Sequence, residues 1–95
     1  MNFMSHSPLS SRELSSLKAR SQKLEPYLRV GKAGLSDSFI AQVEEALRHH
    51  DLIKIKFDGH KDEKKELAPL IAEKTNSLLI LRVGHTATYF RAAHA

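Results

Sequence analysis

Apolar residues recur at the spacing of an α-helix in three segments of the chain. In the first, Glu13 follows Ser10 by three residues, which is the spacing of a capping box. The apolar stripe of this segment carries three leucines: Leu14, Leu17 and Leu24. Pro26 cannot continue a helix, so we expect the first helix to end before it.

The second and third helices are expected in the middle of the chain. Ser36 can cap the second one, and Asp37 in its first turn suits the helix dipole. Its apolar face consists of Phe39, Ile40, Val43, Ala46 and Leu47. The third helix is expected from about residue 61 to 75, with Asn76 as a left-handed cap. Pro69 lies inside this segment and predicts either a kink or a later start.

Two strands are expected before the third helix. Residues 27–30 form a short apolar run that leads into a glycine pair. Residues 52–57 alternate with period two, which directs Ile53, Ile55 and Phe57 inward. The same alternation gives this strand a basic outer face, made of Lys54 and Lys56.

A hairpin is expected at the end of the chain. Residues 78–83 are apolar at successive positions, which predicts a central strand covered on both faces. Gly84 and His85 fit a two-residue turn of type II′. We expect this turn to lead into an edge strand at residues 86–91.

The element order α-β-α-β-α-β-β predicts an α/β fold with a mixed four-stranded sheet and three helices. Strand–helix–strand connections favour parallel pairing, and the final hairpin adds an antiparallel strand. The second and third helices are expected on one face of the sheet and the first on the other. We expect a flexible arm at residues 1–9, one domain at 10–91 and a tail at 92–95.

Composition excludes several classes of protein. A chain of 95 residues with 41% apolar residues suits one globular domain, which we expect to be a monomer. No apolar run approaches the roughly 18 residues of a membrane-spanning helix. The chain has no cysteine, which excludes disulfides, thiol catalysis and zinc–thiolate sites. The first residues lack a signal-peptide pattern, so a cytoplasmic location is expected.

The charge distribution indicates an anionic partner. The net charge is +4 and the isoelectric point is about 9.6, above the threshold of about 9 that is typical of nucleic-acid-binding domains. Between residues 18 and 32, five basic residues face a single acid, Glu25. The five are Lys18, Arg20, Lys23, Arg29 and Lys32. Such a run is also compatible with an ordinary solvated face.

The most informative motif is the G-x-x-G step Gly31-Lys32-Ala33-Gly34, between the first strand and the second helix. Glycines allow positive φ and close approach of a ligand, while the free N–H groups and the helix dipole favour an anion. Lys32 adds a mobile charge at the tip. A plain strand-to-helix turn uses glycine in the same way. The motif lacks the pattern of a P-loop or of a dinucleotide-binding fingerprint, so nucleotide binding is not expected.

Several segments together resemble the CRM domain, the chloroplast RNA-splicing and ribosome-maturation family whose free-standing bacterial members are the YhbY-like proteins. The similarity extends over residues 10–91. It rests on Leu17-Lys18, Leu24-Glu25-Pro26, residues 30–36, residues 50–56, Gly84-His85 and the closing Tyr89-Phe90-Arg91. Arg20, Ser21, Pro69 and Phe90 depart from the family pattern.

The resemblance implies an RNA-binding domain with a fold like the C-terminal domain of translation initiation factor three. It also implies ribosomal RNA in large-subunit precursors as the target. The family's RNA-binding positions correspond to Lys18, Gly31, Lys32, Ala33, Gly34, Lys54, Lys56 and Arg91. Charge and position add Lys23, Arg29 and His85 as candidate RNA contacts.

The remaining chemistry gives no sign of an enzyme or of a cofactor. His49 and His50 are adjacent and point about 100° apart on a helix, and the chain has no His-x₃-His pair that could hold a metal. Asp51 and Asp58 are expected at strand ends rather than in a catalytic cleft. Two functions stay open: RNA binding, and a protein-interaction module that presents the basic face to acidic partners.

Overall fold

Hydroxyl side chains start the first two helices at the positions that the sequence predicts. The computed structural model describes residues 9–58 and 64–92. At the start of α1 (Ser11–Lys23), the Glu13 N–H donates to Ser10 Oγ (3.1 Å) and the Ser10 N–H donates to Glu13 Oε1 (2.8 Å). At the start of α2 (Asp37–His49), the Phe39 N–H donates to Ser36 Oγ (3.1 Å). Both caps satisfy backbone donors that the helix itself leaves free.

The third helix, α3 (Lys64–Thr75), contains Pro69 within its length. The first residues of the predicted helix, 61–63, lie outside the described part of the chain. Pro69 cannot donate to the Lys65 carbonyl, but Lys65 is exposed, so water can reach this carbonyl. Asn76 has φ 54° and ends the helix as the predicted left-handed cap.

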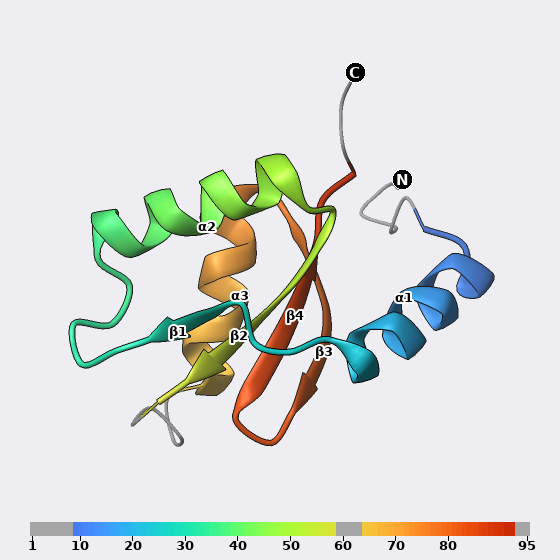
Figure 1. Cartoon of the computed structure of the whole chain (residues 1–95), viewed down its shortest axis with the longest axis horizontal. Coiled ribbons are helices and arrows are strands. Elements are labelled where there is room, and N and C mark those ends of the chain that lie inside the picture. Colours follow the sequence, from blue (N-terminus) through green and yellow to red (C-terminus); the bar gives the residue numbers. More distant parts are fainter. Residues whose placement is uncertain (1–8, 59–63, 93–95) are drawn as a thin grey trace.

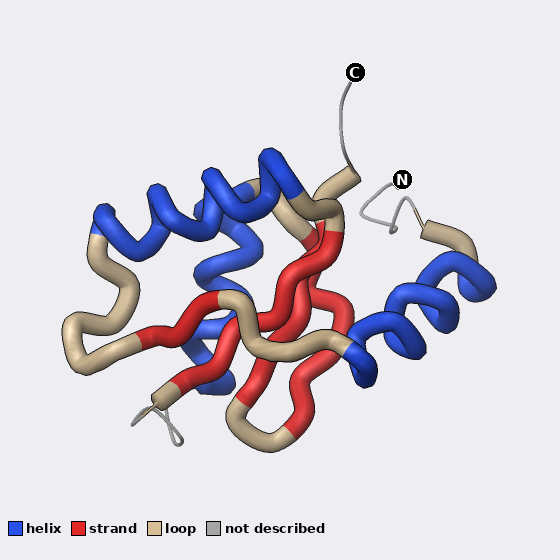
Figure 2. Tube along the Cα trace, in the orientation of Figure 1, coloured by secondary structure: helices blue, strands red, loops and turns tan. Residues whose placement is uncertain are grey.

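The four strands form one mixed sheet, as predicted. They are β1 (Leu28–Val30), β2 (Leu52–Phe57), β3 (Leu78–Val83) and β4 (Thr86–Phe90). Their spatial order is β1-β2-β4-β3 (Figure 2). β1 pairs with β2 in parallel, and β4 pairs antiparallel with both β2 and β3.

The predicted positions of the last two strands in the sheet were wrong. β4 is a central strand, and β3, which we expected at the centre, is an edge strand. The register explains the apolar run of β3: Leu79 pairs with Tyr89 and Leu81 with Thr88, so Ile80 is an extra, bulged residue. Ile80 and Leu81 therefore pack with the same hydrophobic cluster. The expected cover on both faces is nevertheless present, because Leu79 packs with the core under α2 and α3 whereas Ile80 packs on the α1 side.

The sheet has helices on both faces, in the predicted arrangement. α2 and α3 pack on one face, where their apolar residues join those of the strands in one core cluster. Buried members of this cluster include Phe39, Val43, Ile55, Ile71 and Tyr89. α1 packs on the other face, where Leu17 meets Leu52 and Ile80 in a second cluster. Figure 1 shows α1 standing apart from α2 and α3.

Two buried polar contacts connect β4 to the helices. On the α1 face, the hydroxyls of Ser21 and Thr88 lie 2.6 Å apart, and both residues are 1% exposed. On the other face, the Tyr89 hydroxyl donates to the carbonyl of Ala68 in α3 (2.9 Å). Burial raises the pKa of Tyr89, so its phenol stays a neutral donor.

The Ser21–Thr88 contact predicts a non-additive mutational effect. Ser21→Ala should lower the free energy of unfolding by about 1 to 2 kcal/mol, because it leaves the buried Thr88 hydroxyl without its partner. Adding Thr88→Val should restore part of that loss, because both polar groups are then gone. Urea unfolding of both single variants and the double variant measures this coupling. Strictly additive losses would show that the two hydroxyls do not depend on each other.

Candidate nucleic-acid interface

The Gly31–Gly34 loop forms a tight turn in which the two glycines have different roles. The Gly34 N–H donates to the Gly31 carbonyl (3.0 Å), and Gly34 has φ +69°, in the left-handed region that favours glycine. Gly31 lies outside that region, and a Cβ added to it would meet no atom within 4 Å. Lys32 and Ala33 are exposed. The chain's own structure thus explains a glycine at position 34 but not at position 31.

The start of α2 adds less to anion binding than the sequence predicted. Ser36 Oγ already accepts the Phe39 N–H, and Asp37 places a negative charge in the first turn. A phosphate beside this loop would therefore depend on the loop backbone and Lys32 more than on the helix dipole.

The loop and the β3–β4 hairpin lie at the same end of the sheet (Figure 1). Val30 pairs with Phe57, and the Phe57 N–H donates to the carbonyl of His85 in the hairpin turn (2.8 Å). Gly84 has φ +58°, which is the conformation that a type II′ turn requires at its first central position. His85 is exposed at this turn.

Three candidate residues on the strands lie on the face that α1 partly covers. Arg29 and Lys56 are direct neighbours in the β1–β2 ladder, and Lys54 lies two residues earlier on β2. The Asp58 carboxylate lies 3.2 Å from Arg29 Nη1 and 4.0 Å from Lys56 Nζ. One carboxylate between two cations leaves a net positive charge at this end of β1 and β2. Because these ion pairs are exposed, they contribute little to the stability of the fold.

The two candidate lysines of α1 point in different directions. Lys18 and Lys23 are both exposed, and five helical positions separate them by roughly 140° around the axis. Lys18 lies one turn before Gln22 and on the same side of α1. Within the described ranges, no ion pair involves Lys18, Lys23, Lys32 or Lys54, whereas Arg20 pairs with Asp51 at 3.0 Å.

Arg91 lies at the other end of the sheet, away from the loop. Its backbone N–H donates to the Asp51 carbonyl, just before β2. Its guanidinium donates to Glu44 Oε1 in α2 and to the Thr75 carbonyl in α3, both at 2.8 Å, and its side chain is only 19% exposed. These contacts join three elements, so internal packing accounts for this arginine. An RNA contact at Arg91 stays a prediction.

The two histidines at the end of α2 contact neighbouring side chains. His49 Nε2 lies 2.8 Å from Glu45 Oε2, and this hydrogen bond lowers the pKa of the Glu45 carboxyl. His50 packs edge-on against Tyr27, with ring centroids 5.1 Å apart. The described part of the chain contains no cluster of three His, Asp or Glu residues suited to a metal ion. None of its helices is long and apolar enough to cross a membrane.

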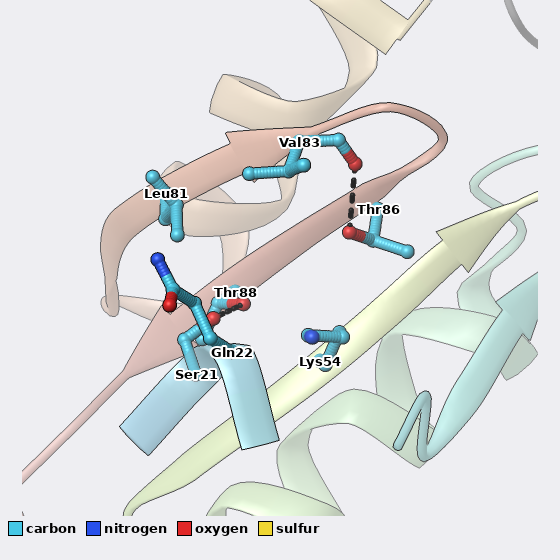
Figure 3. A pocket seen from close by; sticks show the side chains of 7 residues that line it. All are labelled: Ser21, Gln22, Lys54, Leu81, Val83, Thr86 and Thr88. Atoms are coloured by element: carbon cyan, nitrogen blue, oxygen red, sulfur yellow. Dashed lines mark hydrogen bonds between the residues drawn. The ribbon is translucent and has the colours of Figure 1, made fainter. Parts of the chain in front are cut away.

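A hollow between α1 and the sheet was missed by the sequence analysis. It measures about 270 Å³ and lies between the end of α1, β2, β4 and β3 (Figure 3). Gln22, Thr86 and Thr88 line it beside the predicted Lys54. One signal in the sequence could have indicated a polar sheet face. Thr86 and Thr88 are spaced by two residues, as are Lys54 and Lys56, and the two pairs lie opposite each other on neighbouring strands.

These elements define a small α/β domain with an exposed glycine loop and a partly uncovered, basic sheet face. The chain belongs to the CRS1/YhbY (CRM) domain family, whose sequence model matches residues 9–91. The similarity that the motifs indicated is therefore confirmed.

Relatives and a solved structure agree with this assignment. An RNA-binding protein of Haemophilus influenzae (strain ATCC 51907 / DSM 11121 / KW20 / Rd) is 33% identical over 84 residues, which is 87% of this chain and 85% of the relative. A protein of Bacillus subtilis (strain 168), named "Probable RNA-binding protein YqeI", is 29% identical and covers 79% of each chain. The solution structure of SAV1595 from Staphylococcus aureus has a TM-score of 0.78 at 27% identity, over 92% of both chains.

The contacts of Arg91 predict a structural effect of its removal. Arg91→Gln should lower the free energy of unfolding by about 1 to 3 kcal/mol, because Glu44 loses its partner in a half-buried place. Arg82→Gln is the matched control, since Arg82 is exposed and makes no ion pair in the described structure. Thermal and urea unfolding of the two variants provide the measurement. Equal stabilities would contradict the structural role of Arg91.

Proposed function

We propose that this protein binds structured RNA through the Gly31–Gly34 loop and the basic residues on the α1 side of the sheet. The observation that carries the proposal is Gly31, a glycine that neither backbone conformation nor internal packing requires. A glycine followed by an exposed lysine is what close approach of a phosphate backbone needs. The RNA-binding names of the relatives support the same partner.

Phosphate contacts provide the affinity in this proposal. Lys18, Lys32 and Lys54 carry charges that no carboxylate of the described residues neutralises. Arg29 and Lys56 share one carboxylate, that of Asp58. Such contacts position a protein on RNA and recognise its shape. Lys23 on the outer side of α1 and His85 in the hairpin turn lie at the margins of this surface.

The target follows from the family resemblance. We take it to be ribosomal RNA in precursors of the large ribosomal subunit, bound in the cytoplasm by a monomer. Co-sedimentation of the chain with such precursor particles, compared with mature subunits, tests this finer proposal. Association with neither, alongside intact binding to isolated RNA, would restrict the proposal to RNA binding alone.

Salt dependence tests the electrostatic part of the proposal. With three to five phosphate contacts, log K for a structured RNA should fall against log[salt] with a slope of roughly −2 to −5. Lys32→Gln should weaken binding and reduce the magnitude of the slope by about 0.7 to 0.9, because one contact is lost. Fluorescence anisotropy at several salt concentrations measures both quantities.

Lys74→Gln provides the control for Lys32→Gln. Lys74 is exposed in the last turn of α3, on the other face of the sheet, so its removal should leave the slope unchanged. A slope near zero for the unmodified chain would contradict RNA binding by charge. It would favour the alternative of a protein-interaction module.

Substitution of Gly31 tests the loop itself. Gly31→Asp places a carboxylate where a phosphate is proposed to approach, while Gly31→Asn adds a side chain of the same shape without charge. Both should fold with little loss of stability, because position 31 has space for a Cβ and no positive φ. We expect RNA affinity to fall at least tenfold for Gly31→Asp and clearly less for Gly31→Asn, measured beside thermal unfolding.

Gly34 is a poorer test position. Its φ of +69° strains any other residue, so a loss of binding there would be mixed with a loss of stability. Full RNA affinity in a folded Gly31→Asp variant would show that phosphates do not approach the loop.

A further inference from the structure

The hollow beside α1 has a polar floor with one unused donor. Ser21 and Thr88 share a single hydrogen bond of 2.6 Å, and both are almost fully buried. Two hydroxyls have two hydrogens, and only one of these can lie between the two oxygens. Among the described residues no further acceptor contacts either hydroxyl, so one O–H can donate to a group inside the hollow.

The walls of the hollow combine apolar and hydrogen-bonding groups. Figure 3 shows Gln22 and Leu81 across the opening from Lys54 and Thr86, with Val83 between them at the rim. Val83 is 57% exposed and, with Leu81, gives the hollow an apolar wall. The Thr86 hydroxyl donates to the Val83 carbonyl (2.9 Å), which leaves its oxygen free to accept. The Gln22 amide can both donate and accept.

The size of the hollow limits what can enter. Its volume of about 270 Å³ is slightly below the roughly 300 Å³ at which sites for drug-sized ligands begin. A cavity of about 150 Å³ is enough for benzene. The hollow therefore suits one planar heterocycle of one or two rings rather than a side-chain cluster or a peptide.

The charges around the hollow suit a ligand that carries a phosphate. Lys54 lies at the opening and has no carboxylate partner in the described ranges. Lys56 follows it on the same face of β2, and Lys18 lies on the Gln22 side of α1. A flat ring with a phosphate beside it is a nucleotide.

We infer that this hollow binds one unpaired base of an RNA, and that it accepts uracil or guanine in preference to adenine. The inference rests on the proposed function and adds a site at which the protein distinguishes one RNA base from another. Uracil and guanine present a carbonyl oxygen beside a ring N–H. The carbonyl would accept from the free hydroxyl or Lys54, and the N–H would donate to Gln22 or Thr86. Adenine offers these donors only ring nitrogens, each with a single lone pair, whereas a carbonyl oxygen can accept from the hydroxyl and Lys54 together.

Nucleotide titrations test the hollow without any larger RNA. In ¹⁵N-correlation NMR spectra of the full chain, uridine 5′-monophosphate should shift the Gln22 side-chain amide and the backbone amides of Thr86 and Thr88. Adenosine 5′-monophosphate should shift them at least about fivefold less at equal concentration. Ribose 5-phosphate should not move the Gln22 amide. Equal shifts with all three compounds would overturn the inference, because they would reflect phosphate binding alone.

A blocking variant tests the hollow in RNA. The unmodified chain should bind a hairpin with one bulged uridine about fivefold or more tightly than the same hairpin with a bulged adenosine. Val83→Trp should abolish this preference by filling the hollow, and Val83→Thr, which keeps the size of the side chain, should retain it. Tryptophan is well tolerated in strands, so Val83→Trp should fold. If it does not, Gln22→Ala on the exposed side of α1 is the alternative variant, and it should weaken the same preference.

The outcomes separate this inference from the proposed function. Salt-dependent binding without any preference between the two hairpins would overturn the base site and leave the RNA-binding proposal standing. Base-selective shifts with mononucleotides but no binding to either hairpin would support the hollow and overturn the proposed function.

Discussion

The fold depends on one short strand that is buried on both faces. β4 provides hydrogen bonds to β2 on one side and to β3 on the other. Its side chains alternate between the two cores: Ala87 and Tyr89 lie under α2 and α3, and Thr88 lies under α1. Because these three residues are at most 1% exposed, a shift of register by one residue would place Tyr89 and Thr88 in each other's environment. All three layers therefore fix their positions through β4.

Local signals in the sequence were sufficient to predict the elements but not their neighbours. Each of these signals lies within a few residues of sequence: the caps at Ser10 and Ser36, the period-two run of β2 and the turn at Gly84. Strand order depends on contacts between distant residues, and here the local evidence was misleading. The expected edge position of β4 followed from its place after the final turn, whereas the partner that buries Thr88 is Ser21, 67 positions earlier. The edge strand β3 looked central because its apolar side chains face both cores, Leu79 under α2 and α3 and Ile80 under α1.

The same distinction holds for the candidate site. Sequence patterns predicted an exposed lysine between two glycines, and the structure shows Lys32 in that place. They could not distinguish the roles of the two glycines. The φ of Gly34 requires glycine and that of Gly31 does not, but in the sequence both are simply glycines of one turn. Arg91 was predicted as an RNA contact from the family resemblance, whereas its ion pair with Glu44 joins residues 47 positions apart and could not be read from the sequence. The hollow needs three strands and a helix end to meet, so no single segment reveals it.

The extent of α1 explains why part of the sheet face is available at all. α1 ends at Lys23, and Pro26 prevents it from continuing across the sheet. The helix therefore covers Leu52, Ile80 and Thr88 but leaves Lys54, the partner of Thr88 on β2, at the opening of the hollow. Toward this opening the β2 and β4 side chains on the same face change from leucine and phenylalanine to lysine and threonine. A sheet face left open by a helix that stops early needs such polar residues to stay hydrated. Because they are held by strands rather than by a loop, they also keep a fixed geometry toward whatever binds there.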